Sequence, residues 1–294
     1  MNDAAPQQLH DSVVQRWGWD IVSGSLPPGT RIVADDAAVQ LGVSRTVVRE
    51  AVRVLDSMGL ITVRRRVGIT VLPPSNWNPF DPNIIRWRLA GPDRLIHLQS
   101  LSELRSAIEP LAARLAADHA TPEQCGALTA AVIGMSATAR SANAASYLSH
   151  DSDFHRTMLL ASGNPMLAGL ADVVVEVLAG RTRHSLMPSV AEPEAIRLHG
   201  VVASSIQARD GQAAEQAMLS IVAESATAIT AIHDQPGPSA DDDANRTPLP
   251  SVLTAAKVRR ATRQDGQSDP TKEGPPIEST ETTGDEGAGC SVLS

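Results

Sequence analysis

Three side chains that can bind a divalent metal are spaced so that two helices can bring them together. Asp151 and His155 are four residues apart, so they share one face of a helix, and His199 follows in a later segment. One carboxylate and two imidazoles suit zinc, nickel or manganese, with positions left open for the oxygens of a small acid. The Asp-x-x-x-His spacing is also that of a hydrogen bond on a helix surface, so spacing alone leaves both interpretations open.

A second pattern lies near the N-terminus, where arginines are spaced for contact with nucleic acid. Arg45 and Arg49 are four residues apart and project from one face of a predicted helix. An arginine can donate two hydrogen bonds to O6 and N7 of guanine, and Ser44 and Thr46 can hold phosphates. The alternative is that the arginines are solvated charges, with Arg49 paired to a neighbour such as Glu50.

The elements around these arginines are predicted in the order helix, turn, helix and β-hairpin. The predicted helices cover 13–21, 36–41 and 45–58, with Asp35 and Ser44 as N-caps of the last two, and the predicted strands cover 60–63 and 69–72. This is the order of a winged helix-turn-helix, whose second helix reads base edges in the major groove. Arg65, Arg66 and Gly68 lie at the hairpin tip, where they can reach the minor groove or its phosphates.

The rest of the chain is predicted to be mainly α, as an antiparallel helical bundle. Apolar residues recur at spacings of three and four from Leu101 to Leu115, and further helices are expected at about 143–161, 165–186, 192–208 and 211–233. We divide the chain into a flexible tail (1–10), a DNA-binding domain (11–73), a packed linker (74–94), a helical effector-binding and dimerisation domain (95–235) and a disordered tail (236–294).

Composition supports this division. Hydrophobic residues make up 42% of the chain but aromatic residues only 2%, which favours cores of packed aliphatic helices. The net charge is −8, yet residues 1–73 hold eight arginines against seven acidic residues. Two cysteines exclude a disulfide framework and a thiolate zinc site. The sequence shows neither a signal pattern nor a long apolar run, so we expect a cytoplasmic protein.

Residues 12–72 resemble the GntR family of bacterial transcription regulators. The matching residues are Ile21–Gly24, Pro28-Gly29, Gly42–Arg45, Val48–Ala51, Leu55, Gly59-Leu60, Gly68 and Val71. The resemblance implies that Arg45, Thr46 and Arg49 contact operator DNA and that the wing contributes around Gly68. The chain departs from the family where a basic residue usually approaches the phosphates before the second helix, because here the segment is acidic at Asp35 and Asp36.

Residues 95–234 resemble the helical FCD effector domain of the FadR-like branch of that family, and the linker resembles that of regulators of sugar-acid catabolism. The matching residues are Glu103–Arg105, Glu109-Pro110, Asp151–His155, Ser162–Pro165, His199, Asp210, Ala213-Ala214 and Met218. The resemblance implies a repressor that a small carboxylic acid releases from operator DNA. We also expect a homodimer, because one winged helix offers few contacts and two-fold dimers read palindromic half-sites. We expect Arg105, Asn164 and Arg181 to contact this effector, with Arg183 and His184 as further candidates.

The resemblance also implies a metal at Asp151, His155 and His199, but one family ligand is missing. Metal-binding members usually carry another histidine on the last helix, at the position of Ile221, which has no donor atom. Two outcomes stay open. Three ligands still hold zinc, nickel or manganese more weakly, or the metal is lost and Asp151 and His155 contact the effector directly.

Two other classes of protein are alternatives to a regulator that responds to a small molecule. A metal-dependent enzyme is disfavoured, because the sequence has no Gly-rich phosphate loop, nucleophile elbow or His-Glu-x-x-His motif. A DNA-binding dimer whose helical domain binds no small molecule is the other alternative.

Overall fold

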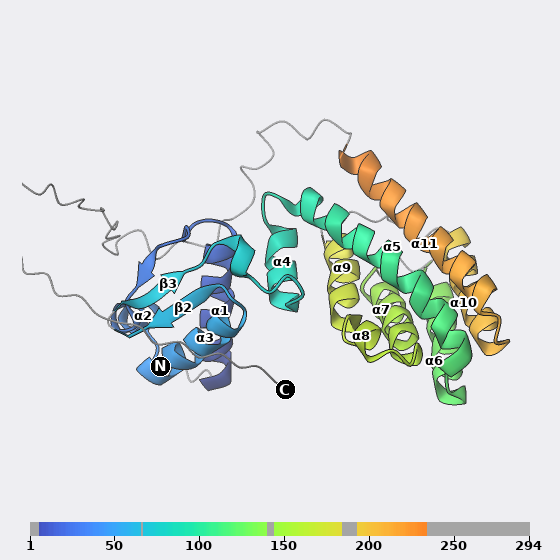
Figure 1. The fold of residues 1–294 in the computed structure, drawn as a ribbon, viewed down its shortest axis with the longest axis horizontal. Coiled ribbons are helices and arrows are strands. Elements are labelled where there is room, and N and C mark those ends of the chain that lie inside the picture. Colours follow the sequence, from blue (N-terminus) through green and yellow to red (C-terminus); the bar gives the residue numbers. More distant parts are fainter. Residues whose placement is uncertain (1–5, 66, 140–143, 184–192, 234–294) are drawn as a thin grey trace, which may run out of the picture. The chain divides into compact units, whose positions relative to one another are not determined.

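The computed structural model describes residues 6–65, 67–139, 144–183 and 193–233. The fold of these residues is mainly α, with one small sheet near the N-terminus (Figure 1). Within them, no helix is long and apolar enough to cross a membrane. The predicted C-terminal tail, Arg66 and His184 lie outside the described residues.

The N-terminal part is a winged helix-turn-helix. Its elements are α1 (Pro6–Val22), β1 (Arg31–Ile32), α2 (Ala34–Leu41), α3 (Arg45–Ser57), β2 (Ile61–Arg64) and β3 (Gly68–Val71). The three strands form an antiparallel sheet in the order β1-β3-β2, in which Thr70 of β3 is opposite both Arg31 and Thr62. The strand β1 was not predicted, and it adds a third strand to the expected hairpin.

Two boundaries differ from the prediction. Helix α1 begins at Pro6, so residues 6–10 are helical and do not belong to a tail. Helix α2 begins at Ala34 with Val33 at its N-cap, so Asp35 lies inside the first turn and is not the cap. The carboxylate of Asp35 still favours the helix start through the helix dipole, and its side chain is left available for another partner.

Helix α3 has the predicted start. The Ser44 hydroxyl oxygen accepts a hydrogen bond from the Val47 backbone N–H at 3.3 Å, which caps the helix. Its inner face buries Val48, Val52 and Leu55. The opposite face, which carries the arginines, is therefore exposed to solvent. The helix ends before Gly59, which has a φ of +76°. A Cβ there would lie 2.1 Å from the Asn76 carbonyl oxygen, so only glycine fits this turn.

The predicted linker contains structure of its own: a 3-10 turn, η1 (Pro74–Asn76), and helix α4 (Pro82–Ala90). Asp81 caps α4 by accepting hydrogen bonds from the backbone N–H groups of Asn83 and Ile84 at 2.9 and 3.4 Å.

Helix α4 contributes to two apolar cores. Ile84 and Trp87 are buried with the winged-helix core, whereas Ile85 and Leu89 are buried with Leu98 and Val177 of the helical domain. The Trp87 indole N–H donates to Gln15 Oε1 at 3.0 Å. Its ring also fills the space beside Gly18 of α1, where an added Cβ would lie 2.0 Å from Trp87 Cη2.

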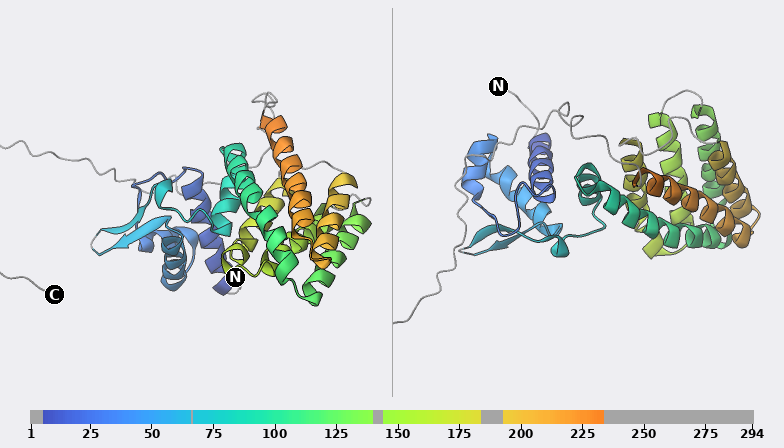
Figure 2. Two further views of the ribbon diagram at one scale, coloured as in Figure 1. Left: turned by 45° about the vertical axis from the view of Figure 1, so that its right-hand side comes forward. Right: turned by 90° about the horizontal axis from the view of Figure 1, so that it is seen from above.

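The helical domain is built from seven helices in the described residues. They are α5 (Arg94–His119), α6 (Pro122–Thr138), α7 (Ala144–Ala161), α8 (Pro165–Ala168), α9 (Ala171–Arg183), α10 (Pro193–Gln207) and α11 (Gly211–His233). Helices α5 and α11 run side by side (Figures 1 and 2). The expectation of one helix over 165–186 is wrong, because the chain breaks at Gly169 and Leu170 into α8 and α9. The core is aliphatic apart from Phe154, as the composition predicts.

Candidate functional site

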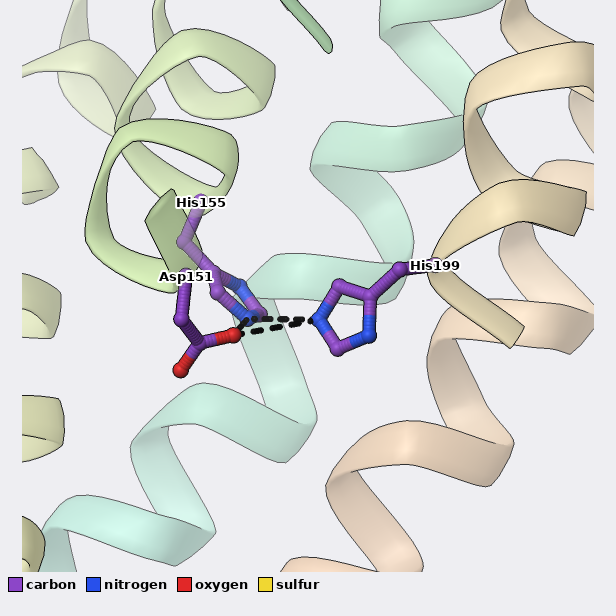
Figure 3. Close-up of side chains that lie close together, drawn as sticks. All are labelled: Asp151, His155 and His199. Atoms are coloured by element: carbon purple, nitrogen blue, oxygen red, sulfur yellow. Dashed lines mark hydrogen bonds and ion pairs between the residues drawn. The ribbon is translucent and has the colours of Figure 1, made fainter. Parts of the chain in front are cut away.

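Asp151 and His155 of α7 meet His199 of α10 in the interior of the helical domain (Figure 3). Asp151 Oδ1 lies 3.6 Å from His155 Nε2 and 3.3 Å from His199 Nε2, and the two Nε2 atoms are 3.4 Å apart. All three residues are buried. The structure therefore brings together the three residues that the sequence suggests as metal ligands.

A hydrogen bond on the side away from Asp151 and His155 fixes the orientation of the His199 ring. Its Nδ1 lies 2.7 Å from the Ala195 carbonyl oxygen, which can only accept a hydrogen bond. Nδ1 therefore carries the proton in the neutral ring, and the lone pair of Nε2 points toward Asp151 and His155. The edge of Phe154 packs against the same ring, with centroids 4.8 Å apart. His199 is thus held in the tautomer that a metal ligand needs.

A carboxylate on a third helix completes the surroundings of His155. Glu109 of α5 has its Oε2 atom 3.0 Å from His155 Nδ1, in the position of an ion pair whose N–H is not well aligned for a hydrogen bond. Arg105, one turn earlier, donates from Nε and Nη2 to Glu109 at 2.7 and 3.1 Å. The contact between Glu109 and His155 is not among the contacts predicted from the sequence. The i, i+4 spacing of Arg105 and Glu109 was the only available signal.

These contacts set the charges of the cluster. Burial raises the pKa of Glu109, but Arg105 and His155 outweigh burial and lower it to about 2. Burial lowers the pKa of His155, but Glu109 and Asp151 outweigh it and raise the pKa to about 9. Burial opposes the charge of Asp151 too, yet its interactions with the neighbouring imidazoles, chiefly that of His155, hold its pKa well below the usual value. At neutral pH, His155 is therefore a cation between two carboxylates.

The donor set fits a divalent transition metal. Metal–nitrogen bonds of about 2.1 Å place neighbouring donor atoms roughly 3–3.5 Å apart, and the three donor pairs here fall at 3.3–3.6 Å. Ile221 of α11 is buried in the same apolar core and offers no donor. The described residues therefore supply three ligands, and the remaining positions would be open.

A buried arginine on α9 lacks a full set of partners. Arg181 is 4% exposed, and its Nη1 donates to the Ser225 hydroxyl, but its Nε has no acceptor among the described residues. Burial, together with the positive charge of Arg105, lowers the pKa of Arg181 to about 10. Tyr147 is partly buried, and burial and Asp151 raise the pKa of its hydroxyl. Tyr147 and Arg181 interact electrostatically with each other and with Asp151.

The other expected effector residues already have partners within the protein. Arg105 is bound to Glu109. The Asn164 side chain accepts from the Met166 backbone N–H at 2.9 Å and so caps α8. Arg183 lies 3.3 Å from Glu176, which also pairs with Arg86 of α4. Arg181 is therefore the one of the three expected effector residues with a buried side-chain nitrogen that has no acceptor in the described structure.

The expected DNA-contacting residues lie where α3 and the wing are exposed. Arg45, Thr46 and Arg49 are exposed on the first turns of α3. Glu50 pairs with Arg53 at 2.6 Å and not with Arg49. Among the described residues, Arg49 forms no ion pair, so the alternative in which a neighbour such as Glu50 neutralises it finds no support.

The three remaining DNA-contacting candidates that the structure describes lie at the N-cap of α3 and in the wing. The hydroxyl of Ser44 is used as the helix cap. Arg65 is exposed in the turn of the wing, and Gly68, with a φ of +88°, begins β3. The positive φ explains why the wing turn carries a glycine at this point.

Comparison with known proteins supplies two family matches. The family model described as "Bacterial regulatory proteins, gntR family" matches residues 9–71, and the model described as "FCD domain" matches residues 100–224. These ranges agree with the winged helix-turn-helix and with the helical effector domain that the sequence predicts.

Two curated relatives are regulators of the same class. The Galactonate operon transcriptional repressor of Escherichia coli K12 is 29% identical over 217 residues, covering 73% of this chain and 94% of that protein. The uncharacterized HTH-type transcriptional regulator YieP of the same organism is 30% identical, covering 73% of this chain and 92% of that protein. The solved structure of E. coli McbR/YncC covers 77% of this chain and 99% of its own, with 20% identity and a TM-score of 0.46. The curated relatives are regulators of transcription, which confirms the choice of that class over an enzyme.

Proposed function

Because the chain belongs to the gntR family of bacterial regulatory proteins, we propose that it is a repressor that a small carboxylic acid releases from operator DNA. The observation that carries the proposal is the exposed face of α3, where Arg45 and Arg49 project beyond a helix whose other face is buried. A helix presented in this way can enter the major groove, and each arginine can donate two hydrogen bonds to one guanine.

The effector is a carboxylate because the buried cluster has a surplus of positive charge. Arg105, Arg181 and His155 are cationic at neutral pH, whereas Glu109 and Asp151 are the buried anions that face them. A buried charge without a partner is costly, so an anion of one negative charge is favoured there. Arg181 has the free donor that a carboxylate can accept from. The similarity to a galactonate operon repressor supports a sugar acid as the carboxylate.

Asp151, His155 and His199 would hold a divalent metal in this pocket, and the metal would act as a Lewis acid toward carboxylate and hydroxyl oxygens. His155 has to lose its proton for its Nε2 to become a ligand, and Glu109 then remains against Nδ1–H to orient the ring. Metal uptake should therefore release a proton near neutral pH.

The second candidate is a pocket without metal, favoured by the absence of a donor at Ile221. In that pocket, Asp151 and His155 bind the hydroxyl groups of the effector directly, while Arg181 binds its carboxylate. Both versions use Arg181 toward the carboxylate, and a chelator should abolish the response only in the version with metal.

The repressor acts as a homodimer in the cytoplasm, on a near-palindromic operator. One winged helix makes few base contacts, and two-fold symmetry doubles them across two half-sites. The FCD match supports the proposal that the helical domain forms the dimer.

The experiment combines DNA binding with ligand screening. DNA sites are first selected by the protein from a random library, and their release is then followed by fluorescence anisotropy as sugar acids are added. A ligand at one hundred times its Kd should also raise the free energy of unfolding by about 2.7 kcal/mol. The Arg181→Gln variant should bind DNA normally and lose the response to the acid.

The matched control is Arg183→Gln, two residues further along α9, where the side chain is half-exposed and paired with Glu176. This variant should respond to the acid as the native protein does. Absence of any stabilising carboxylic acid, with DNA binding intact, would favour a regulator without a small-molecule effector.

A further inference from the structure

An ion pair joins the two helices of the helix-turn-helix at the surface. Asp35 Oδ1 lies 2.9 Å from Arg45 Nε, and the two side chains are 64% and 74% exposed. Asp35 belongs to the first turn of α2, and Arg45 is the first residue of α3. In this motif the first helix crosses the DNA backbone, while the first turn of the second helix reaches the base edges. The pair therefore connects the helix that lies near the DNA phosphates, α2, to the helix that reaches the base edges, α3.

The geometry of the pair leaves the recognition edge of the arginine available. Asp35 accepts from Nε, which is one of the five N–H donors of the guanidinium. The Nη1 and Nη2 groups remain, and they provide the two parallel donors that match O6 and N7 of guanine. An arginine held at Nε also has fewer side-chain conformations to lose on binding than one that is free in solvent.

The Asp35 carboxylate favours base contact by Arg45 but disfavours contact with the DNA phosphate backbone. DNA phosphates attract arginines wherever they lie, and such contacts carry no sequence information. A carboxylate in the first turn of α2 repels phosphates, and it holds Arg45 by a competing ion pair. The loss of the basic residue usual at this point thus weakens backbone binding and favours base contact by the same arginine.

We propose that Asp35 is a specificity-determining residue, which positions the Arg45 guanidinium for one guanine and disfavours its binding to phosphate. The inference rests on the proposed role of α3 in base recognition. Exposed ion pairs contribute little to folding stability, so removing this one should alter DNA recognition and leave the fold unchanged.

The neighbouring residue offers a matched control. Asp36 is also exposed in the first turn of α2 and carries the same charge, but it forms no ion pair with the described residues. Asp35→Ala and Asp36→Ala therefore remove the same charge at nearly the same place, and only the first breaks the contact with Arg45. The higher helix propensity of alanine offsets the lost interaction with the helix dipole in both variants, and thermal unfolding should verify that both remain folded.

The experiment measures the affinity of each variant for the selected DNA site, for the same site altered at each base pair, and for random DNA. Both Asp35→Ala and Asp36→Ala should bind random DNA more tightly, because each removes a negative charge near phosphates. Only Asp35→Ala should lose about 3- to 5-fold in discrimination at one base-pair position, the same position at which Arg45→Ala loses discrimination. The double variant Asp35→Ala/Arg45→Ala should lose no more than Arg45→Ala alone.

Two results would overturn the inference in different ways. If Asp35→Ala keeps native discrimination or behaves as Asp36→Ala does, while Arg45→Ala loses discrimination, Asp35 is a solvated charge and the proposed function stands. If Arg45→Ala itself keeps native discrimination at every position, the role of α3 in the proposed function is wrong, and the role of Asp35 fails with it.

Discussion

The Nε2 atoms of His155 and His199 lie 3.4 Å apart, although the two residues come from helices α7 and α10. Two imidazole nitrogens this close favour a shared ligand, because both rings are buried and Asp151 lies against both. The arrangement gives the first of five predictions.

Metal binding should depend on His199. Protein purified without an affinity tag and stripped with chelator should take up one zinc, nickel or manganese ion per chain, with release of a proton from His155. His199→Ala should remove this uptake and the response to the effector, and it should leave operator binding intact. His119→Ala, which alters an exposed histidine, should behave as the native protein. No bound metal, together with an effector response that survives chelator, would decide for the pocket without metal.

Glu109 should stabilise the helical domain through its two cationic partners. Glu109→Gln leaves the buried cation Arg105 without its carboxylate and His155 with Asp151 alone, which should lower the free energy of unfolding by about 3–5 kcal/mol in urea denaturation. The control is Glu50→Gln, which breaks an exposed pair with Arg53 and should leave the urea midpoint unchanged. Equal effects of the two variants would mean that the buried ion pair contributes nothing beyond a surface pair.

His97 should make the protein less stable in mild acid. Burial, with a smaller effect of Arg88, lowers the pKa of His97 to about 4, against an ordinary value near 6.5. Between these pH values the unfolded chain binds a proton that the folded chain excludes, so stability falls as the pH drops through this window. His97→Gln should remove this contribution, which is on the order of 1–3 kcal/mol at full effect. The difference between native and variant stability should be constant above pH 7. A difference that is also constant from pH 7 to pH 4 would contradict the prediction.

The arginines of α3 should carry base recognition. Arg45→Ala and Arg49→Ala should each cost about 1–3 kcal/mol at the selected site and relax discrimination at one position. Arg65→Ala, in the wing, should weaken binding to all sequences similarly and reduce the salt dependence. Arg53→Ala is the control on the same helix, because Arg53 is paired with Glu50. Gel shifts on selected and scrambled DNA distinguish these outcomes.

The chain should be a dimer at micromolar concentration. Light scattering should give twice the chain mass of 31.0 kDa, and footprinting should protect two half-sites about one helical turn of DNA apart. A monomeric mass combined with specific DNA binding would contradict the prediction that dimerisation is needed to read the operator.

Elements with strong local signals could be predicted from the sequence. The start of α3 follows from the Ser44 cap, and the start of α6 follows from the capping box of Thr121 and Gln124. The two-residue strand β1 could not be predicted, because it is defined by pairing with β3 and not by its own pattern. Helix α4 was missed because its apolar residues face two different cores, which removes the single apolar stripe that marks a surface helix.

The same distinction applies to the site. The spacing of Asp151 and His155 is local, so their common face could be predicted, and the family resemblance supplied His199. The approach of Glu109 to His155 depends on how α5 packs against α7, for which a single sequence carries no signal. The pairing of Asp35 with Arg45 was missed for the same reason, since it joins two helices across a turn.

Helix α4 belongs to both halves of the chain, because its side chains complete the apolar core of each. Cutting the chain after residue 73, where the wing ends, would strip Ile84 and Trp87 from the winged-helix core, and cutting after residue 90 would take Ile85 and Leu89 from the other. Recombination between genes can therefore exchange such domains freely only if the incoming partner brings a compatible helix. Exchange of effector domains among DNA-binding domains is therefore constrained by the nine residues of α4, which must pack against both domains.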